Sequence, residues 1–175
     1  MKSRGMKQNF AILFVVVCAG VLCSQPSWQE RVGRQPDGTF LLSNGWRLKP
    51  AGQQVPLDTL PMSSALSRDG KYLLVLNGGY KPPSISVIAV DSMKETARVP
   101  VADAWLGLAF SPDGGKVYVG GGSKATVFEF TFSQGELKPA HELVVTPADK
   151  RQAADFIADV AVSPDGERIL AGDLY

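Results

Sequence analysis

A few short stretches of the sequence hold residue types that could bind a ligand or do chemistry. Gly120-Gly121-Gly122-Ser123-Lys124 has the composition of a phosphate-binding loop, but a Walker A motif places Lys before Ser or Thr and leads into a helix. In this chain Ser precedes Lys and a strand-like apolar run follows, so we interpret the segment as a loop joining two strands. His141 is the only histidine, and its setting after Pro139-Ala140 favours a solvated residue at a strand end over a base or a ligand.

Three aspartates share the pattern S-x-D-G, which suggests turns and not metal binding. They lie 44 and then 52 residues apart, and no D-x-D-x-D spacing surrounds them, as a calcium loop would require. Proline at the second position presets φ to about −65°, Asp tolerates the next turn position, and Gly can take a positive φ. We also expect the serine to accept a hydrogen bond from a turn N–H. The predicted turn residues are Ser67, Asp69, Gly70, Ser111, Pro112, Asp113, Gly114, Ser163, Pro164, Asp165 and Gly166.

Five other residues form the candidate ligand-binding surface. Asp155 and Asp159 follow or flank a connection that is about eight residues longer than its equivalent one repeat earlier, and such loops often carry function. Trp105 takes the equivalent position one repeat earlier, and Tyr80 and Lys81 lie in a loop expected on the same face. The alternative, in which Trp105 packs between sheets and the charges are solvated, stays open. We predict no catalytic residue, no cofactor and no metal-ligand set in the chain.

The surroundings of the three tetrapeptides repeat as well. Each follows one short apolar run and precedes another, and the first two repeats add a third run, Ile85 to Val90 and Thr126 to Phe130. The third runs alternate in hydrophobicity, which predicts strands with one side more buried than the other. A turn every 44 residues or so fits a hairpin between the first two strands of a four-stranded unit, the length of a β-propeller blade. The predicted fold class is therefore all-β, an incomplete propeller ring.

The repeats resemble the YVTN-type β-propeller repeat family, which is related in shape to quinoprotein dehydrogenases and lactonases. Leu108 to Gly114 with Val117-Tyr118-Val119, and Ser84 to Asp91 (SISVIAVD), carry the likeness over residues 60–175. Gly33 to Pro50, followed by Pro56 to Pro61, is similar to the opening of exported bacterial propellers that an alkaline-phosphatase-like phosphoesterase domain often follows. The resemblance implies the fold, and no phosphoesterase motif lies within the chain.

Residues 1–24 have the features of a secretory signal peptide. Lys2, Arg4 and Lys7 precede an apolar run from Phe10 to Leu22, which is too short to span a bilayer as a helix. Cleavage after Ala19, Gly20 or Ser24 predicts a periplasmic or secreted protein with no membrane span. Lipoprotein anchoring at Cys23 is the less favoured alternative, because Leu22 is larger than the residue expected before such a cysteine.

Loss of the leader changes the charge balance. The 18 basic residues fall to 15 against 17 acidic ones, a net charge of −2 that provides no basic footprint for nucleic acid. Both cysteines, Cys18 and Cys23, lie in or beside the leader. An exported protein would therefore contain no internal disulfide and would depend on burial and sheet pairing for stability.

The domain plan has a leader, a short segment and about two and a half blades. The segment 25–59 contains a hairpin signal, Asn44-Gly45, between two strand-like runs, and we expect this hairpin in the blade that closes the ring. Predicted blades cover 60–101, 102–155 and, in part, 156–175. A propeller needs at least four blades, so we expect either the N-terminal part of a longer protein or a chain that assembles through its exposed edges with other copies.

Three functions fit this plan. The first is an exported binding or scaffold module with an unknown ligand or protein partner on the channel face. The second is the propeller part of an enzyme, either a phosphoesterase or a lactonase-like protein. The third is a protein-interaction surface without a small ligand.

Overall fold

The computed structural model describes residues 31–174, which contain β-strands and no helix, and so no helix able to cross a membrane. The predicted signal peptide and both cysteines lie outside the described residues. The chain divides into two compact units, one up to Ala51 and one from Gly52 onwards.

The smaller unit is a three-stranded antiparallel ribbon. Its strands are β1 (Gly33–Arg34), β2 (Phe40–Leu41) and β3 (Arg47–Leu48), in the order β1-β2-β3. The β2–β3 hairpin turns at Asn44-Gly45, where Gly45 has a φ of 83° and its N–H donates to the Leu42 carbonyl. Asn44 fixes the turn further, because its side-chain oxygen accepts from the Trp46 N–H at 3.0 Å. The hairpin signal in the sequence therefore coincides with the ribbon's second turn.

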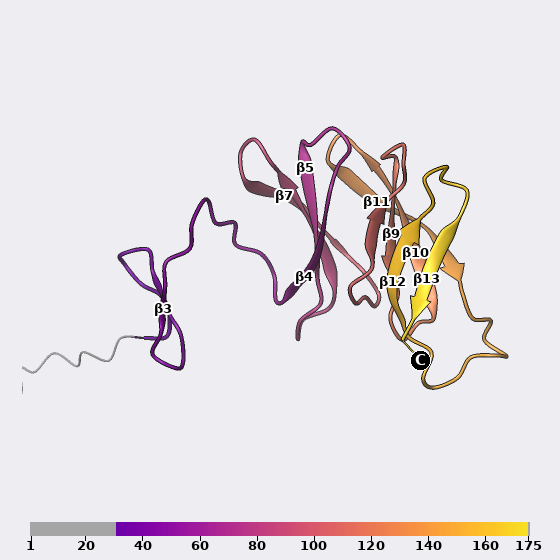
Figure 1. Ribbon diagram of the computed structural model, residues 1–175, viewed down its shortest axis with the longest axis horizontal. Helices are drawn as coiled ribbons and strands as arrows, with labels where there is room; N and C mark the ends of the chain where they lie inside the picture. The colour runs from indigo at the N-terminus through magenta and orange to yellow at the C-terminus, as the bar shows by residue number, and fades with distance from the viewer. Residues whose placement is uncertain (1–30, 175) are drawn as a thin grey trace, which may run out of the picture. The chain divides into compact units, whose positions relative to one another are not determined.

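The larger unit contains two four-stranded meanders and a two-stranded sheet, stacked side by side (Figure 1). The first sheet consists of β4 (Pro61–Leu66), β5 (Tyr72–Asn77), β6 (Ser84–Ala89) and β7 (Lys94–Pro100). The second sheet consists of β8 (Leu108–Phe110), β9 (Lys116–Gly120), β10 (Thr126–Ser133) and β11 (Glu136–Val144). The third sheet consists of β12 (Ile157–Val162) and β13 (Ile169–Asp173). In each sheet, neighbouring strands in the sequence pair with one another.

Apolar residues on facing sides of the sheets form two layers of core. Leu74, Leu76, Ile85 and Val87 of the first sheet pack with residues of the second sheet that include Val117 and Val119. The opposite side of the second sheet packs on the third, with Tyr118 and Val127 against Ile157 and Val160. Strand β9 contributes to both layers because successive side chains point to opposite faces.

One expectation about these strands is wrong. The hydrophobic alternation of the run that forms β6 predicts one more exposed side, yet Ser84 to Ile88 are all buried. The serines at alternate positions are not solvated, because Ser86 lies in the sheet interior and accepts a hydrogen bond from the Asn77 amide at 2.9 Å. A serine can be buried when its hydroxyl has a hydrogen-bond partner, because the side chain is small. The serines of β6 therefore mark a buried hydrogen-bonded group and not a solvated side of the strand.

The three S-x-D-G tetrapeptides connect the first and second strands of the three sheets, and all lie at one end of the unit. In each, the Ser hydroxyl donates to the Asp carboxylate at 2.5–2.7 Å and accepts from a backbone N–H at 2.9 Å. The Gly has a φ between 72° and 78°, a conformation that few other residues adopt without strain. Arg68 of the first turn donates to the Pro112 carbonyl of the second at 3.1 Å. This hydrogen bond joins the first turn to the second.

Candidate functional site

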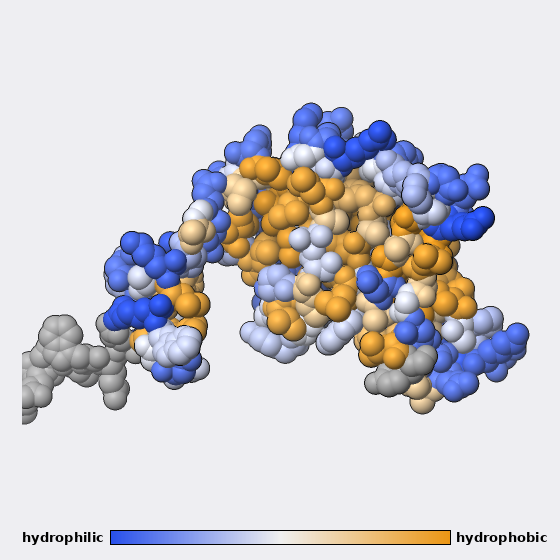
Figure 2. Space-filling view, in the orientation of Figure 1, coloured by the Kyte–Doolittle hydropathy of each residue, from blue (hydrophilic) through white to orange (hydrophobic). Residues whose placement is uncertain are grey.

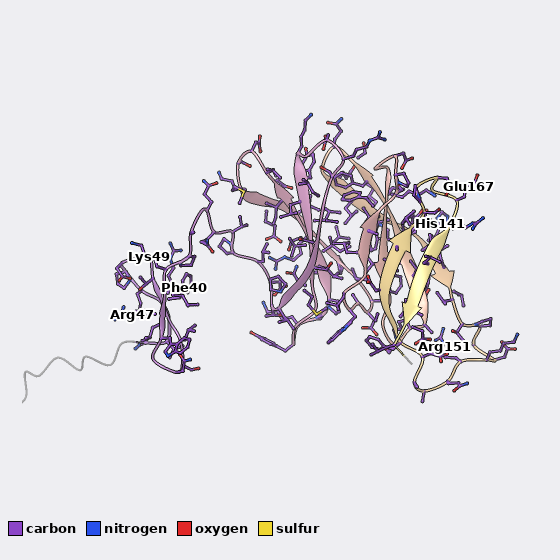
Figure 3. All side chains as sticks on the ribbon, in the orientation of Figure 1. Phe40, Arg47, Lys49, His141, Arg151 and Glu167 are labelled. Atoms are coloured by element: carbon purple, nitrogen blue, oxygen red, sulfur yellow. The ribbon has the colours of Figure 1, made fainter. Side chains whose placement is uncertain are left out.

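The other end of the larger unit, which we name the loop end, is built from four connections: 78–83, 101–107, 121–125 and 145–156. Glu167 beside a turn and Arg151 in the longest connection mark the two opposite ends in Figure 3. All five residues of the candidate ligand-binding surface lie in or next to these connections. Their positions follow from contacts that each connection makes with its neighbours.

The first connection presents Tyr80. The Gly78 and Gly79 N–H groups donate to the carbonyls of Leu60 and Thr59, at 3.1 and 3.0 Å. A Cβ atom on Gly79 would lie 2.5 Å from the Thr59 hydroxyl oxygen, so a glycine is needed where these segments meet. Tyr80 follows directly and is 91% exposed. An aromatic ring therefore projects from backbone that is held on both sides.

Lys81 takes part in an ion-pair network at the base of the same connection. Its Nζ lies 3.2 Å from the Asp58 carboxylate, which the Arg98 guanidinium also contacts at 3.0 Å. Arg98 in turn binds Glu95 through two nitrogens, at 2.7 and 2.8 Å. The hydrogen bond from Lys81 is the main cause that lowers the pKa of Asp58, and the Thr59 N–H adds to it. Lys81 thus fixes the connection to the segment that precedes β4.

Asp103 links the second and third connections. Its carboxylate accepts from the Ser123 N–H at 2.9 Å and from the Ser123 hydroxyl at 2.6 Å, while its other oxygen accepts from the Ala104 N–H. A Cβ on Gly122 would lie 3.0 Å from this carboxylate, and Gly122 also forms an antiparallel bridge with Ile157. Gly120 thus ends β9, and Gly121 and Gly122 begin the loop that joins β9 to β10. Their small size allows Gly122 to approach Asp103 closely, and allows Gly120 and Gly122 to approach the third sheet.

Trp105 packs where the second and third sheets meet, Asp155 lies in the connection beside that contact, and Asp159 follows within β12. The Trp105 ring packs edge-on against Phe156, with ring centroids 6.0 Å apart. Asp155, next to Phe156, accepts from the Gln152 N–H at 3.0 Å and so closes a turn within the longest connection. Asp159 lies on the outward side of β12, the side away from the second sheet. Trp105 thus contacts Phe156, the residue that follows Asp155, whereas Asp159 lies on the other side of the third sheet.

Tyr80 and Lys81 are separate from that group but belong to neighbouring connections. The first connection lies next to the second, because a Cβ atom added to Gly78 would be 3.9 Å from the Ala104 carbonyl oxygen. Two apolar residues not expected from the sequence complete the surface: Leu60 is 58% exposed and Leu106 is 47% exposed. Leu60 has a positive φ of 51°, unusual for a branched residue, and no sequence signal predicts it.

His141 lies away from the loop end, in the middle of β11 opposite Glu129, so the expectation of a strand-end residue is wrong (Figure 3). Its Nδ1 lies 3.2 Å from the Glu129 carboxylate, which Lys116 also contacts at 3.1 Å. Burial acts to raise the pKa of Glu129, but hydrogen bonds with Lys116 and His141 outweigh it and lower that pKa. Among the described residues, no three His, Cys, Asp or Glu side chains gather as a metal site would require.

Comparison with solved structures identifies the arrangement. A candidate 6-phosphogluconolactonase from Bacteroides uniformis superposes with a TM-score of 0.53 at 23% sequence identity, covering 80% of this chain and 42% of that one. These sheets are blades of a β-propeller. Hydrazine synthase of Kuenenia stuttgartiensis gives a TM-score of 0.58 at 21% identity, over 84% of this chain and 45% of that one. A protein from Lactobacillus plantarum gives 0.56 at 16% identity, over 77% and 43%.

The chain spans less than half the length of each of these three matched chains. At such identities the likeness shows the fold alone. No protein-family model matches the sequence, and no curated protein matches it. A function for the loop end must therefore be argued from its own geometry. The fold shows only that the four connections lie on one face of a propeller.

Proposed function

We propose that the chain is a binding or scaffold module whose partner is a protein that docks on the loop end. The observation that carries this proposal is the exposure of four aromatic or aliphatic side chains at the loop end, three on its connections and one, Leu60, just before β4: Leu60, Tyr80, Trp105 and Leu106. Exposed aromatic and aliphatic side chains on fixed backbone lose little conformational freedom when a partner covers them.

The polar groups around these side chains support the same proposal. Asp58 and Glu95 neutralise Lys81 and Arg98, and the Asp103 carboxylate accepts hydrogen bonds from Ser123, so these charges hold loops in place. The Trp105 ring packs edge-on against Phe156 and remains 40% exposed. A rim of satisfied polar groups around apolar anchors is the usual composition of a protein interface.

We also propose that the module is exported after removal of residues 1–24 and that it belongs to the YVTN-type group of propellers. The basic and apolar composition of the leader and the repeated S-x-D-G pattern support these two assignments. The mass of the N-terminal peptide of the endogenous protein tests the first: a start near residue 20 to 25 is expected, and an intact leader would contradict export.

Site-specific photo-cross-linking in the native cell tests the binding function. A photoreactive residue in place of Tyr80 should give one defined protein adduct, which the second substitution Trp105→Ser should reduce severalfold. The same photoreactive residue in place of Glu167, at the turn end, is the matched control and should not give that adduct. Equal adducts from both positions, or none from Tyr80, would reject the loop end as the binding surface.

The lactonase-like alternative keeps one supporting observation, the name of the Bacteroides uniformis structure, which at 23% identity bears on the fold. Hydrolysis of a sugar δ-lactone by the purified chain, lost when a loop-end residue is replaced, would favour the enzyme over the binding module. The phosphoesterase alternative concerns a domain for which the chain contains no motif.

A further inference from the structure

The connection 145–156, between β11 and β12, is exposed along most of its length. Residues 147–154 are all exposed, and Figure 1 shows the segment as a loop that extends away from the strands. The outer part of this loop is hydrophilic in Figure 2, in contrast to the apolar side chains over the sheets. Exposed loops of this kind are the places at which proteases cut folded proteins.

The backbone of this connection forms two local turns. The Lys150 N–H donates to the Pro147 carbonyl at 2.9 Å, and the Asp155 N–H donates to the Gln152 carbonyl at 3.2 Å. The peptide bond between Arg151 and Gln152 lies between these turns. An endopeptidase binds its substrate in an extended form, and opening two local turns costs less free energy than removing a strand from a sheet.

The sequence around this bond suits an endopeptidase that recognises basic side chains. Lys150 and Arg151 are adjacent and exposed, and Gln152 follows them. Lys124, in the shorter connection 121–125, lies in a tight turn that ends at the fully buried Ala125. Proline after a basic residue prevents cleavage, because its ring replaces the N–H of the bond to be cut. Three other exposed basic residues are followed by proline: Lys49, Lys81 and Lys138.

Cleavage of this bond leaves the second and third blades in contact. Gly122 and Ile157 exchange two backbone hydrogen bonds, both of 3.0 Å, across the boundary between these blades. Ile157 is also fully buried and packs with Tyr118 and Val127 of the second blade. These contacts lie outside the connection, so the two fragments stay together after a cut within it.

Asp155 lies where the new N-terminus forms. Its carboxylate accepts from the Gln152 N–H at 3.0 Å, and it forms no ion pair with any residue that the structure describes. Hydrolysis adds water across the bond, breaks it, and leaves a carboxylate on Arg151 and an ammonium on Gln152. The hydrogen bond to Asp155 then joins two opposite charges, which makes it stronger.

We propose that the Arg151–Gln152 bond is a processing site for an endopeptidase that binds basic side chains, and that Asp155 binds the Gln152 ammonium of the cut chain. The new N-terminus is then fixed next to Phe156, on which the Trp105 ring packs. Processing therefore changes the loop end and leaves the blades folded, whether or not a protein docks there.

Limited digestion of the full chain with trypsin tests the site. Within the larger unit, the first cut should follow Lys150 or Arg151, and the two fragments should elute together in size-exclusion chromatography. Replacing both residues, by Lys150→Gln and Arg151→Gln, should slow this cut by about tenfold or more. Lys124→Gln is the matched control and should not slow it. A first cut elsewhere in the larger unit, or fragments that separate without denaturant, would overturn the proposal.

Terminal peptides of the endogenous protein test processing in the cell. Mass spectrometry should find a chain that ends at Arg151 and a chain that begins at Gln152. An endogenous protein in which every molecule keeps the Arg151–Gln152 bond would show that no processing occurs there.

Amine labelling of the nicked chain tests the role of Asp155. An amine reacts only when it is unprotonated, and a free α-amino group has a pKa of about 8. The carboxylate keeps the Gln152 ammonium protonated, so at about pH 7 N-hydroxysuccinimide acetate should label nicked wild type about threefold more slowly than nicked Asp155→Asn. Asp149→Asn is the matched control and should label at the wild-type rate. Equal rates for wild type and Asp155→Asn would reject the ion pair.

Discussion

At the scale of single residues, the serine and aspartate side chains of the three S-x-D-G turns form hydrogen bonds with backbone N–H groups of the turns. Ser67, Ser111 and Ser163 each use one hydroxyl both to donate to an aspartate and to accept from the second strand. The pKa of each aspartate is lowered, first by the serine hydroxyl and then by a backbone N–H. These local bonds span five residues or fewer, which is why the tetrapeptide alone predicts them.

Glu129 provides a pH prediction at this scale. Its pKa lies below the usual 4.5, so its contribution to stability is present above that pH and is lost as the pH falls through the lowered value. Glu129→Gln should reduce the free energy of unfolding by about 1 kcal/mol at neutral pH, because the bond to a charged group is lost. The difference from wild type should shrink below about pH 4.

Denaturant unfolding of both proteins between neutral pH and pH 3 checks this expectation. Glu142→Gln on β11 controls for the loss of one carboxylate. A Glu129→Gln defect that stays constant over the whole range would mean that the carboxylate charge does not stabilise the sheet.

At the scale of elements, the inner strands of each blade were predictable from the sequence and the outermost strands were not. β5 and β9 are nearly continuous apolar runs, and β6 and β10 alternate apolar residues with polar ones. By contrast, β7 and β11 lie at the sheet edge, where most residues are exposed, and Pro139 and Lys138 interrupt the pattern of β11. An edge strand is specified by the neighbour it pairs with, and the local sequence contains little of that information.

The β10–β11 hairpin gives a prediction at this scale. Gly135 has a φ of 83°, and a Cβ there would lie 2.4 Å from the Tyr72 ring of the first blade. Gly135→Ala should therefore lower the free energy of unfolding by about 2–3 kcal/mol, combining backbone strain with a clash between blades. Gly70→Ala is the matched control: it has a φ of 72° and open space, so only the strain of about 1 kcal/mol is expected.

Thermal or denaturant unfolding measures both variants. Tyr72→Leu should recover part of the Gly135→Ala loss, since it removes the ring atoms that the new methyl group meets. Equal losses for the two glycine variants would show that the hairpin does not press on the first blade.

At the scale of the larger unit, the second and third blades contact each other through backbone hydrogen bonds as well as through apolar side chains. The Gly107 N–H donates to the Ala158 carbonyl at 2.9 Å, and a Cβ on Gly107 would lie 2.8 Å from the Val160 nitrogen. The sequence predicted the repeat and its hairpins. The sequence could not predict a contact such as that of Gly107 with Ala158, about fifty positions away. Several glycines have similar local sequences, and only the packing of one blade on the next shows which of them must be small.

Gly107→Ala should separate the third blade from the second without unfolding the first. Hydrogen exchange followed by mass spectrometry should detect faster exchange in β12 and β13 and unchanged exchange in β5 and β6. Gly115→Ala is the matched control, because the nearest atoms to its Cβ would be Asp113 oxygens at 3.6 Å. Faster exchange in all blades at once would show that the stack opens as one unit.

The candidate site shows the same difference between local turns, which the sequence predicts, and contacts between distant residues, which it does not. Asn44-Gly45 and the tetrapeptides predict local geometry, and Tyr80 and Trp105 stand out as aromatic residues in connections. Pairing of Asp103 with Ser123 and of Asp58 with Arg98 joins residues 20 and 40 positions apart, and neither pair has a sequence pattern. The identity of exposed side chains was therefore readable, whereas the contacts that fix them were not.

The connection 145–156 has a consequence for protein engineering. Its two ends are held by the blades, because the Val145 N–H donates to the Ala125 carbonyl and the Phe156 N–H donates to the Asp173 carboxylate. The hydrogen bonds Lys150 N–H to Pro147 and Gln152 N–H to Asp155 stay within the connection. Extra length between fixed ends costs little free energy, about 0.6 kcal/mol for each doubling. A foreign peptide grafted between Asp149 and Gln152 would thus be displayed beside Trp105, with the blades serving as an inert frame.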